Sequence, residues 1–387
     1  MPSNAVVAHG GGPTAVINAS LQGLVEEFRR RSPGQALYGA RYGLSGVLRE
    51  NFLDLLACDP DLIRRAGEAP GSALGSSRLA LADGDYGRIL EVLRRAGVRT
   101  FFYTGGNGSM ETALRLARHA HEARYELQVV GIPKTIDNDL CVTDHTPGYA
   151  STARFFACAA RDVGADNLSL PSPVCVLETL GRNTGWIVAA TSFARRFEDD
   201  APHLIYFPER RLSLDRIAAD VERVYRRLGR AVLAVCEGQL DDRGLPFGAD
   251  VDRAESGLHR LASNLGHTLA RLLSGKLGIR ARAEKPGLLG RCCGPFASPL
   301  DRQEAAACGR AAAAAAAEGA SNVMVALRRE SNAPYRAATF LTPLETVARQ
   351  ERLLPEGWIH PDGHDVLPGF QEYAAPLIGE IPGWARL

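Results

Sequence analysis

Residues 129–140 read VVGIPKTIDNDL, and this stretch sets both the expected fold and the expected chemistry. Residues 129–132 form a short apolar run of the kind found in buried strands, and the run ends at Pro133. A lysine, a hydroxyl and two carboxylates then follow within residues 134–139. Because ligands of open α/β sheets bind beyond the carboxyl ends of the strands, we expect this loop to belong to a functional site.

The same arrangement, an apolar run that ends at a glycine or a polar cluster, recurs along the chain. The further runs are residues 5–8, 100–103, 174–177, 204–207, 232–235 and 323–327. Helical patterns lie between them, for example at residues 19–31, 111–123 and 301–320. This alternation predicts β-α units and parallel sheets covered on both faces by helices. A length of 387 residues predicts two such domains.

The overall charge excludes a protein that binds nucleic acid or membranes through its global field, because 45 basic residues nearly balance 44 acidic ones. None of the eight cysteines forms a C-x-x-C pair, so we interpret them as buried, reduced thiols. No run of about 20 apolar residues could span a bilayer. We therefore expect a cytoplasmic protein.

Two glycine clusters follow strand-like runs and precede helical patterns. They are residues 10–12 and residues 105–109, which read GGNGS. Glycine lets backbone N–H groups approach a phosphate, and a helix N-terminus attracts its charge. A tight turn explains one such cluster equally well, but two in the same context favour phosphate binding. Neither cluster matches the P-loop or the dinucleotide-binding pattern.

The loop at residues 134–139 carries the groups that phosphoryl transfer to a hydroxyl requires. Asp137 can take the proton of an attacking sugar hydroxyl. Asp139 can hold a metal ion directly or through water, and Lys134 can neutralise charge on the moving phosphoryl group. The alternative, an Asx-rich turn after a strand, explains Asp137, Asn138 and Asp139 but not the flanking lysine and threonine.

Arg182 follows Gly181 at the end of another strand-like run, where a guanidinium can stabilise a phosphoryl group in transfer. A single arginine is more often a solvated surface residue, and the same alternative applies to Arg78.

Together these motifs resemble the phosphofructokinase family in order and spacing over almost the whole chain. The matching segments are residues 11–19 (GGPTAVINA), 74–78 (LGSSR), 105–110, 133–140, 143–149 (TDHTPGY), 181–186 (GRNTGW) and 201–209. The chain most resembles the branch rich in diphosphate-dependent members. The motifs typical of that branch include PKTIDND, TDHTPGY, Leu-x-Arg-Cys (here residues 289–292) and a C-terminal motif similar to residues 343–348.

The resemblance implies two doubly wound parallel-sheet α/β domains with the active site in the cleft between them. Residues 1–147, with about 288–335, are expected to bind the donor, and residues 148–287, with about 336–387, the sugar phosphate. The implied reaction transfers a phosphoryl group from ATP or diphosphate to C1 of fructose 6-phosphate with Mg²⁺, as in glycolysis. A homodimer or homotetramer with no nucleic-acid or membrane partner is expected.

The family also implies a role for each matching residue. Asp137 would be the general base, Asp139 would support it and the metal, and Arg182 would stabilise the transition state together with Lys134 and Thr135. The expected donor-binding residues are Gly11, Gly12, Arg78, Gly106, Asn107, Gly108 and Ser109. The expected substrate-binding residues are Thr135, Asp137, Leu180, Gly181, Arg182, Glu237, Arg282 and Arg291, with Arg282 reaching in from a neighbouring subunit. Asn107 and Asp139 are the expected metal site.

The chain departs from the family pattern at Asn107, where a metal-linked aspartate is usual, and at Leu180 and Leu288, where methionine and histidine occur. These changes leave the acceptor open between fructose 6-phosphate and another sugar phosphate. A third alternative is a catalytically silent subunit that binds sugar phosphate and regulates a partner. The presence of a base in the loop argues against it, because binding alone needs no base.

The choice of donor rests on two residues that point in different directions. Lys134 resembles diphosphate-dependent members. By the resemblance, diphosphate-dependent members typically carry an aspartate at the position of Gly108. That carboxylate would repel the α-phosphate of ATP, so glycine at this position permits ATP. Our hypothesis slightly favours ATP, with diphosphate close behind and dual use or diphosphate alone as alternatives.

Overall fold

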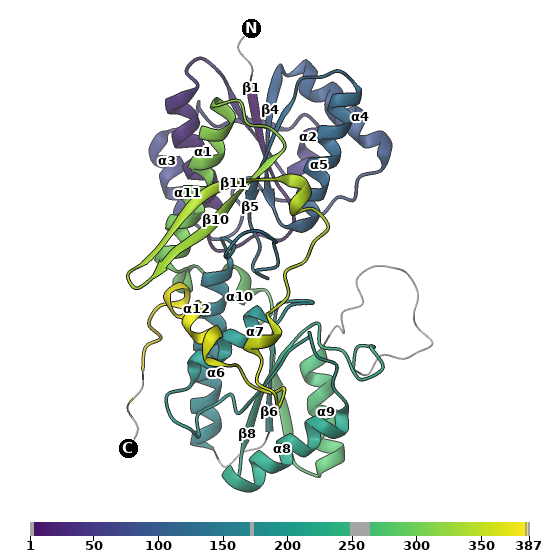
Figure 1. Ribbon diagram of the computed structural model, residues 1–387, viewed down its shortest axis with the longest axis vertical. Coiled ribbons are helices and arrows are strands. Elements are labelled where there is room, and N and C mark those ends of the chain that lie inside the picture. Colours follow the sequence, from purple (N-terminus) through teal and green to yellow (C-terminus); the bar gives the residue numbers. More distant parts are fainter. Residues whose placement is uncertain (1–3, 171–173, 248–263, 384, 386–387) are drawn as a thin grey trace. The chain divides into compact units, whose positions relative to one another are not determined.

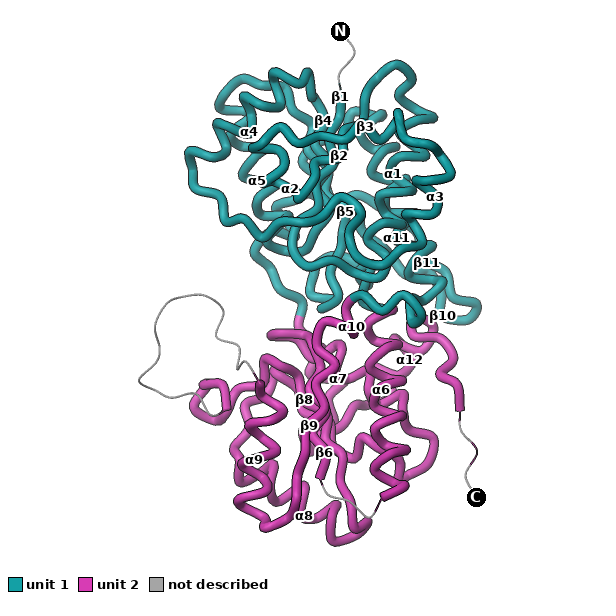
Figure 2. Tube along the Cα trace, turned by 180° about the vertical axis from the view of Figure 1, so that it is seen from behind, with its two compact units in different colours: residues 1–150, 292–352 teal, residues 151–291, 353–387 magenta. Residues whose placement is uncertain are grey.

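The computed structural model describes residues 4–170, 174–247, 264–383 and 385. The chain forms two compact units (Figure 2). Unit 1 comprises residues 1–150 and 292–352, and unit 2 comprises residues 151–291 and 353–387. Each unit has its own sheet, which confirms the predicted α/β class with two domains.

Unit 1 is built on a seven-stranded sheet in the order β11-β10-β5-β4-β1-β2-β3. The strands are β1 (Asn4–His9), β2 (Leu37–Ala40), β3 (Phe52–Asp54), β4 (Val98–Gly105), β5 (Gln128–Pro133), β10 (Val323–Asn332) and β11 (Tyr335–Pro343). The inner strands pair in parallel, whereas β3 and β11 pair antiparallel with their neighbours at the two edges of the sheet.

Helices cover both faces of this sheet (Figure 1). One face packs against α1 (Ile17–Arg31), α3 (Pro60–Glu68) and α11 (Pro299–Ala317). The other packs against α2 (Gly43–Leu48), α4 (Asp83–Arg95) and α5 (Asn107–Glu122). The strands are therefore shielded on both sides, as their continuous apolar runs predicted.

The contact between α1 and α11 depends on small residues. A Cβ on Gly23 would lie 2.1 Å from the Ala306 carbonyl oxygen, and one on Gly309 would lie 1.9 Å from that of Ser20. Both distances are far below van der Waals contact, so only glycine fits at these two crossing points. The alanine run of α11 extends the same surface, and it starts from a Ser298 side-chain cap with Pro299 in the first turn.

Unit 2 is built on a four-stranded, fully parallel sheet in the order β7-β8-β6-β9. The strands are β6 (Val174–Thr179), β7 (Leu204–Tyr206), β8 (Ala231–Cys236) and β9 (Ala281–Glu284). Helices α8 (Leu214–Leu228) and α9 (Leu265–Leu277) pack on one face. Helices α6 (Tyr149–Ser169), α7 (Trp186–Ala190) and α12 (Pro368–Ile378) lie on the other side of the sheet in Figure 1.

All seven apolar runs form strands, but the sequence analysis missed β2, β3, β9 and β11. These four are short, partly exposed or rich in polar residues, so they lack the continuous apolar signal. The pairing of β11 with β10 also places residues 336–352 in unit 1, whereas the sequence analysis assigned them to the second domain.

The cysteines are less buried than the sequence analysis expected. All eight cysteines are free thiols; Cys158, Cys175, Cys236 and Cys308 are buried and the other four are partly buried. Across the described ranges, no helix combines the length and the apolar character needed to cross a bilayer.

Candidate active site

Three loops of unit 1 meet at the carboxyl ends of its strands because β5, β4 and β1 are parallel neighbours. The loops are residues 10–13 after β1, residues 105–109 after β4 and residues 133–139 after β5. We call this group of loops the first edge. Parallel pairing thus brings together the two glycine clusters and the Lys-Thr-x-Asp-x-Asp loop, as predicted from their positions after strands.

Lys134 joins the first glycine cluster to the loop after β5. Its side chain is nearly buried, with 4% of the residue exposed, and its Nζ donates to the Gly12 carbonyl oxygen at 2.8 Å. A Cβ on Gly11, whose φ is +78°, would lie 3.2 Å from that Nζ. A side chain at position 11 would therefore strain the backbone and crowd the ammonium group.

Arg78 belongs to the same edge through its neighbours. The Gly11 N–H donates to the Ser77 carbonyl oxygen at 3.0 Å, and the Ser76 hydroxyl donates to the Gly11 carbonyl oxygen at 2.7 Å. Arg78 follows these residues and is exposed.

The second glycine cluster forms the N-terminus of α5, which begins at Asn107. The first N–H groups of a helix have no intrahelical acceptor, and together with the helix dipole they attract an anion such as a phosphate. Gly108 is exposed, and a Cβ there would meet no atom within 4 Å. The space beside this helix turn is therefore open, as the donor hypothesis required.

The side chains of Asn107 and Asp139 pair across the first edge. The Asn107 Nδ2 donates to the Asp139 Oδ2 at 3.0 Å and to its carbonyl oxygen at 3.3 Å. The Oδ1 atoms of both residues are buried and accept no hydrogen bond from the described residues. Two unpaired buried oxygens fit a hydrated Mg²⁺, which accepts oxygen ligands and keeps several waters.

Asn107 and Asp139 are the side chains of this edge that could contact a metal ion. Among the residues that the structure describes, no group of three or more His, Cys, Asp or Glu side chains could hold a metal. The remaining ligands would be waters and donor phosphate oxygens, which is the usual arrangement for Mg²⁺ in phosphoryl transfer.

Asp137 and Asp139 flank Asn138, whose backbone is left-handed with a φ of +56°. Asparagine adopts this conformation more readily than most residues. The buried Asn138 side chain accepts a hydrogen bond from the Thr146 N–H at 3.1 Å, and the Asp137 N–H donates to the Thr135 Oγ1 at 3.1 Å. From the sequence, Asn138 was interpreted only as part of an alternative Asx-rich turn, and no role in the site was predicted for it.

In unit 2, the loops after β6 and β8 form a second edge. The Glu237 N–H donates to the Thr179 carbonyl oxygen at 2.9 Å, and a Cβ on Gly238 would lie 1.5 Å from the Arg182 carbonyl oxygen. These contacts bring Leu180, Gly181 and Arg182 beside Glu237. Arg182 has a φ of +47°, an unfavourable conformation for arginine of the kind that functional sites retain.

The second edge holds two groups that the sequence analysis missed, Glu178 and Lys285. Glu178 is buried at the end of β6, accepts a hydrogen bond from the Gly266 N–H at 2.7 Å and lies 2.8 Å from the Lys285 Nζ. Burial, and next the charge of Glu178, raise the pKa of Glu237. A carboxylate at the end of an apolar strand was the available sequence signal for Glu178.

The structure does not bring Arg282 to this edge within one chain. Arg282 lies on β9 opposite Cys175, four residues before the end of β6 and so about 13 Å along the strand from Thr179. It forms an ion pair with Asp166 of α6. Arg291 lies in the short helix α10 (Leu289–Cys292) and is partly exposed. The hypothesis that Arg282 serves a neighbouring subunit stays a prediction.

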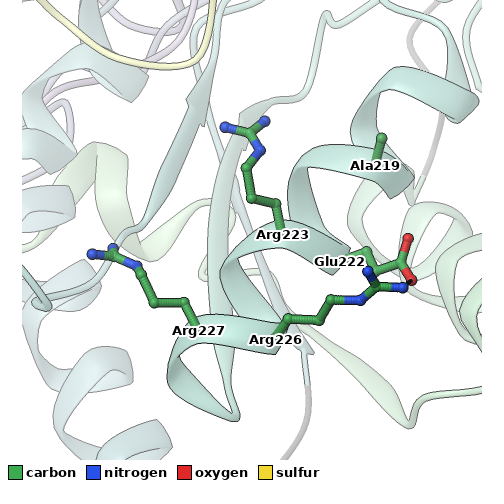
Figure 3. Close-up of a pocket in the computed structure, with 5 residues that line it drawn as sticks. All are labelled: Ala219, Glu222, Arg223, Arg226 and Arg227. Atoms are coloured by element: carbon green, nitrogen blue, oxygen red, sulfur yellow. Dashed lines mark hydrogen bonds and ion pairs between the residues drawn. The ribbon is translucent and has the colours of Figure 1, made fainter.

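A pocket on the surface of α8 is not a candidate for the site (Figure 3). Its lining residues are Ala219, Glu222, Arg223, Arg226 and Arg227. The three arginines form ion pairs with Asp220, Glu222 and Glu198 respectively. The pocket lies on one helix that precedes β8, whereas the loops of the first and second edges follow the carboxyl ends of the strands.

A buried ionic network supports the loop that carries Asp137 and Asp139. His145 is completely buried; its Nδ1 lies 2.8 Å from the Asp144 Oδ1 and its Nε2 lies 2.6 Å from the Glu304 Oε2 of α11. Arg329 of β10 pairs with Asp144, and the Tyr335 hydroxyl of β11 donates to Glu304. Burial alone would lower the pKa of His145, but hydrogen bonds and charge from both carboxylates outweigh it and raise the pKa to about 9.

Comparisons with known proteins match this chain over nearly its whole length. The sequence profile of the family described as Phosphofructokinase matches residues 4–316. A pyrophosphate–fructose 6-phosphate 1-phosphotransferase of Rhodospirillum rubrum is 40% identical, over 99% of this chain and 96% of its own. A sulfofructose kinase of Alkalicoccus urumqiensis is 33% identical, over 91% of each chain. A pyrophosphate-dependent phosphofructokinase structure from Nitrosospira multiformis has a TM-score of 0.89 at 32% identity, over 100% of this chain and 94% of that one.

The His145 network predicts a pH dependence of stability. Because the pKa of His145 is raised from 6.5 to about 9 by folding, its contribution is fully present below pH 6.5 and is lost as the pH rises through about 9. The free energy of unfolding of the wild type, relative to His145→Gln, should fall across this range by on the order of 3 kcal/mol. Urea unfolding at a series of pH values measures it. His121→Gln, an exposed site on α5, is the control. Parallel pH profiles for wild type and His145→Gln would contradict the prediction.

Proposed function

The chain belongs to the phosphofructokinase family, and we propose that it transfers a phosphoryl group from diphosphate to the C1 hydroxyl of fructose 6-phosphate. The observation that carries this proposal is the first edge. Two glycine loops lie there beside Lys134 and the candidate base Asp137. The paired side chains of Asn107 and Asp139 add two oxygens that could bind a metal ion. This combination supplies the groups that a phosphotransferase needs.

The chemistry follows from the groups at the two edges. Asp137 takes the proton of the C1 hydroxyl while a bond forms from the C1 oxygen to the phosphorus. The bond from phosphorus to the bridging oxygen breaks, and phosphate leaves. Lys134 and Arg182 neutralise charge on the phosphoryl oxygens during transfer. Asn107 and Asp139 would hold Mg²⁺, which would supply further neutralisation of phosphate charge.

The acceptor is held by the second edge in this proposal. Glu237 offers a hydrogen-bond acceptor to the sugar hydroxyls, while Leu180 and Gly181 contribute its binding surface. Arg291, and Arg282 of a neighbouring subunit, pair with the phosphate of the sugar. Two guanidinium groups match a dianionic phosphate better than a neutral ligand.

We propose diphosphate as the donor, in place of ATP, which the sequence slightly favoured because of Gly108. The relative that is 40% identical over 99% of the chain is named for diphosphate, and Lys134 lies buried between the two loops expected to bind the donor. ATP remains a second candidate because Gly108 is exposed and leaves open space beside α5. The relative named as a sulfofructose kinase likewise favours a sulfonated ketose as a second acceptor candidate.

Replacing the proposed base tests the reaction directly. Asp137→Asn should lower kcat by about 10²–10⁴-fold, since an amide cannot accept the proton, while sugar-phosphate affinity changes little. Steady-state kinetics and equilibrium binding of fructose 6-phosphate measure the two effects. Asp61→Asn, an exposed carboxylate on α3, should change neither. Turnover of Asp137→Asn near the wild-type value would remove this residue from the mechanism.

Arg291→Ala tests the acceptor phosphate site. Loss of one charge-assisted pair is worth about 1.5–3 kcal/mol, which corresponds to an increase in KM for fructose 6-phosphate of about 10–150-fold. The KM for diphosphate should change little. Arg271→Ala, an exposed arginine of α9, is the control. Equal increases in both KM values would argue against a site specific for the acceptor.

Gly108→Asp tests the donor. The carboxylate would repel the α-phosphate of ATP, so any ATP-supported turnover should fall on the order of tenfold or more while diphosphate-supported turnover persists. Assays with each donor over a concentration series separate the two. Gly87→Asp provides a matched control, because a Cβ there, on α4, also meets nothing within 4 Å. If ATP use survives the aspartate unchanged, Gly108 has no part in donor choice.

A further inference from the structure

The C-terminal segment of unit 1 reaches the loop that carries the proposed base. After β11, Leu344 and Val347 are fully buried in the core cluster that also contains Met110 and Leu140. The segment is thereby anchored, and Arg352 follows five residues after Val347 as the last residue of unit 1.

Arg352 makes an unusual number of contacts with backbone carbonyl oxygens of the loop. Its Nε and Nη2 donate to the Asn138 carbonyl oxygen at 3.2 and 3.1 Å. Its Nη1 donates to the Thr143 carbonyl oxygen at 2.7 Å and also to that of Asp144. Its own N–H donates to the Asp139 carbonyl oxygen at 2.8 Å. One residue therefore binds four carbonyl groups between positions 138 and 144.

The loop needs such a partner because its backbone is irregular. Asn138 and Val142 both have left-handed conformations, with φ values of +56° and +69°. A left-handed valine is strained, and strain of this kind persists only where surrounding contacts impose it. The planar fork of a guanidinium presents five N–H donors spread over three nitrogens, whereas the three donors of a lysine ammonium all lie on one nitrogen and reach fewer, more closely spaced carbonyl oxygens.

We propose that Arg352 is a positioning residue for the reaction: its guanidinium and backbone N–H hold the loop at Asn138 and at residues after it, so that Asp137 and Asp139 stay in working geometry. It touches the carbonyl oxygens of Asn138 and Asp139 directly, so its effect on the carboxylates passes through the backbone. This inference rests on the proposed function, which gives Asp137 and Asp139 their roles.

Arg349 is the matched control, since it lies three residues earlier on the same segment. Its side chain is 68% exposed and pairs with Glu111 at 2.8 Å. Replacing Arg349 removes an arginine and an ion pair from the segment without removing a contact to the loop described above.

The kinetic experiment compares Arg352→Ala, Arg352→Lys and Arg349→Ala with wild type, using fructose 6-phosphate and diphosphate. We expect Arg352→Ala to lower kcat on the order of 10²-fold, because small displacements of reacting groups are costly, with little change in either KM. Arg352→Lys should recover only part of kcat, and Arg349→Ala should resemble wild type. Added guanidinium ion should restore part of the activity of Arg352→Ala but not that of Asp137→Asn.

A second measurement does not depend on activity. Hydrogen exchange of the Asp137 and Thr146 amides, which bond to Thr135 and Asn138, should accelerate in Arg352→Ala and not in Arg349→Ala. Unchanged exchange in Arg352→Ala would overturn the proposal, as would an unchanged kcat or a loss confined to KM. If wild type turns over no fructose 6-phosphate, the proposed function fails, whereas the exchange rates still test whether Arg352 holds the loop.

Discussion

The parallel pairing of β1, β4 and β5 is the constraint on which the rest of the candidate site depends. The central residues of these strands are buried on both faces and apolar, so the polar groups gather toward the strand ends. Parallel direction puts all three ends on one side of the sheet. Loops that are far apart in the sequence are then neighbours, so the Lys134 Nζ can donate a hydrogen bond to the Gly12 carbonyl oxygen.

A site built from loops has carbonyl and amide groups that no helix or sheet satisfies, so other groups must bind them. In unit 1 this task falls on two charged side chains, one buried and one partly buried. His145, between Asp144 and Glu304, ties the loop to α11, and Arg352 ties it to the segment after β11. A buried charge is costly unless it is paired and hydrogen-bonded, and both ring nitrogens of the buried His145 face carboxylates.

Both edges contain left-handed backbone conformations and glycines that lie close to other groups, at or beside predicted residues. Asn138 lies between the two aspartates, and Arg182 follows Gly181; both have positive φ values. Gly11 and Gly238 stand where a Cβ would meet Lys134 and the Arg182 carbonyl group. Of the residues to which the family resemblance gave a role, Gly11, Gly181 and Arg182 therefore have left-handed backbone, which is retained where surrounding contacts impose it.

The sequence by itself determined the seven apolar strands, the polar loops after them and the α/β class, because these depend on the local periodicity and length of each run. It also made Lys134, Asp137 and Asp139 the leading candidates for the site, since their chemistry is concentrated in one short loop. Only the tertiary structure decided that Glu304 pairs with His145 across 159 residues and that Arg352 binds the carbonyl group of Asn138 across 214. It also decided that β11 completes the first sheet. Such pairs leave no periodic trace in the chain, because they form only when packing brings distant segments within hydrogen-bonding distance.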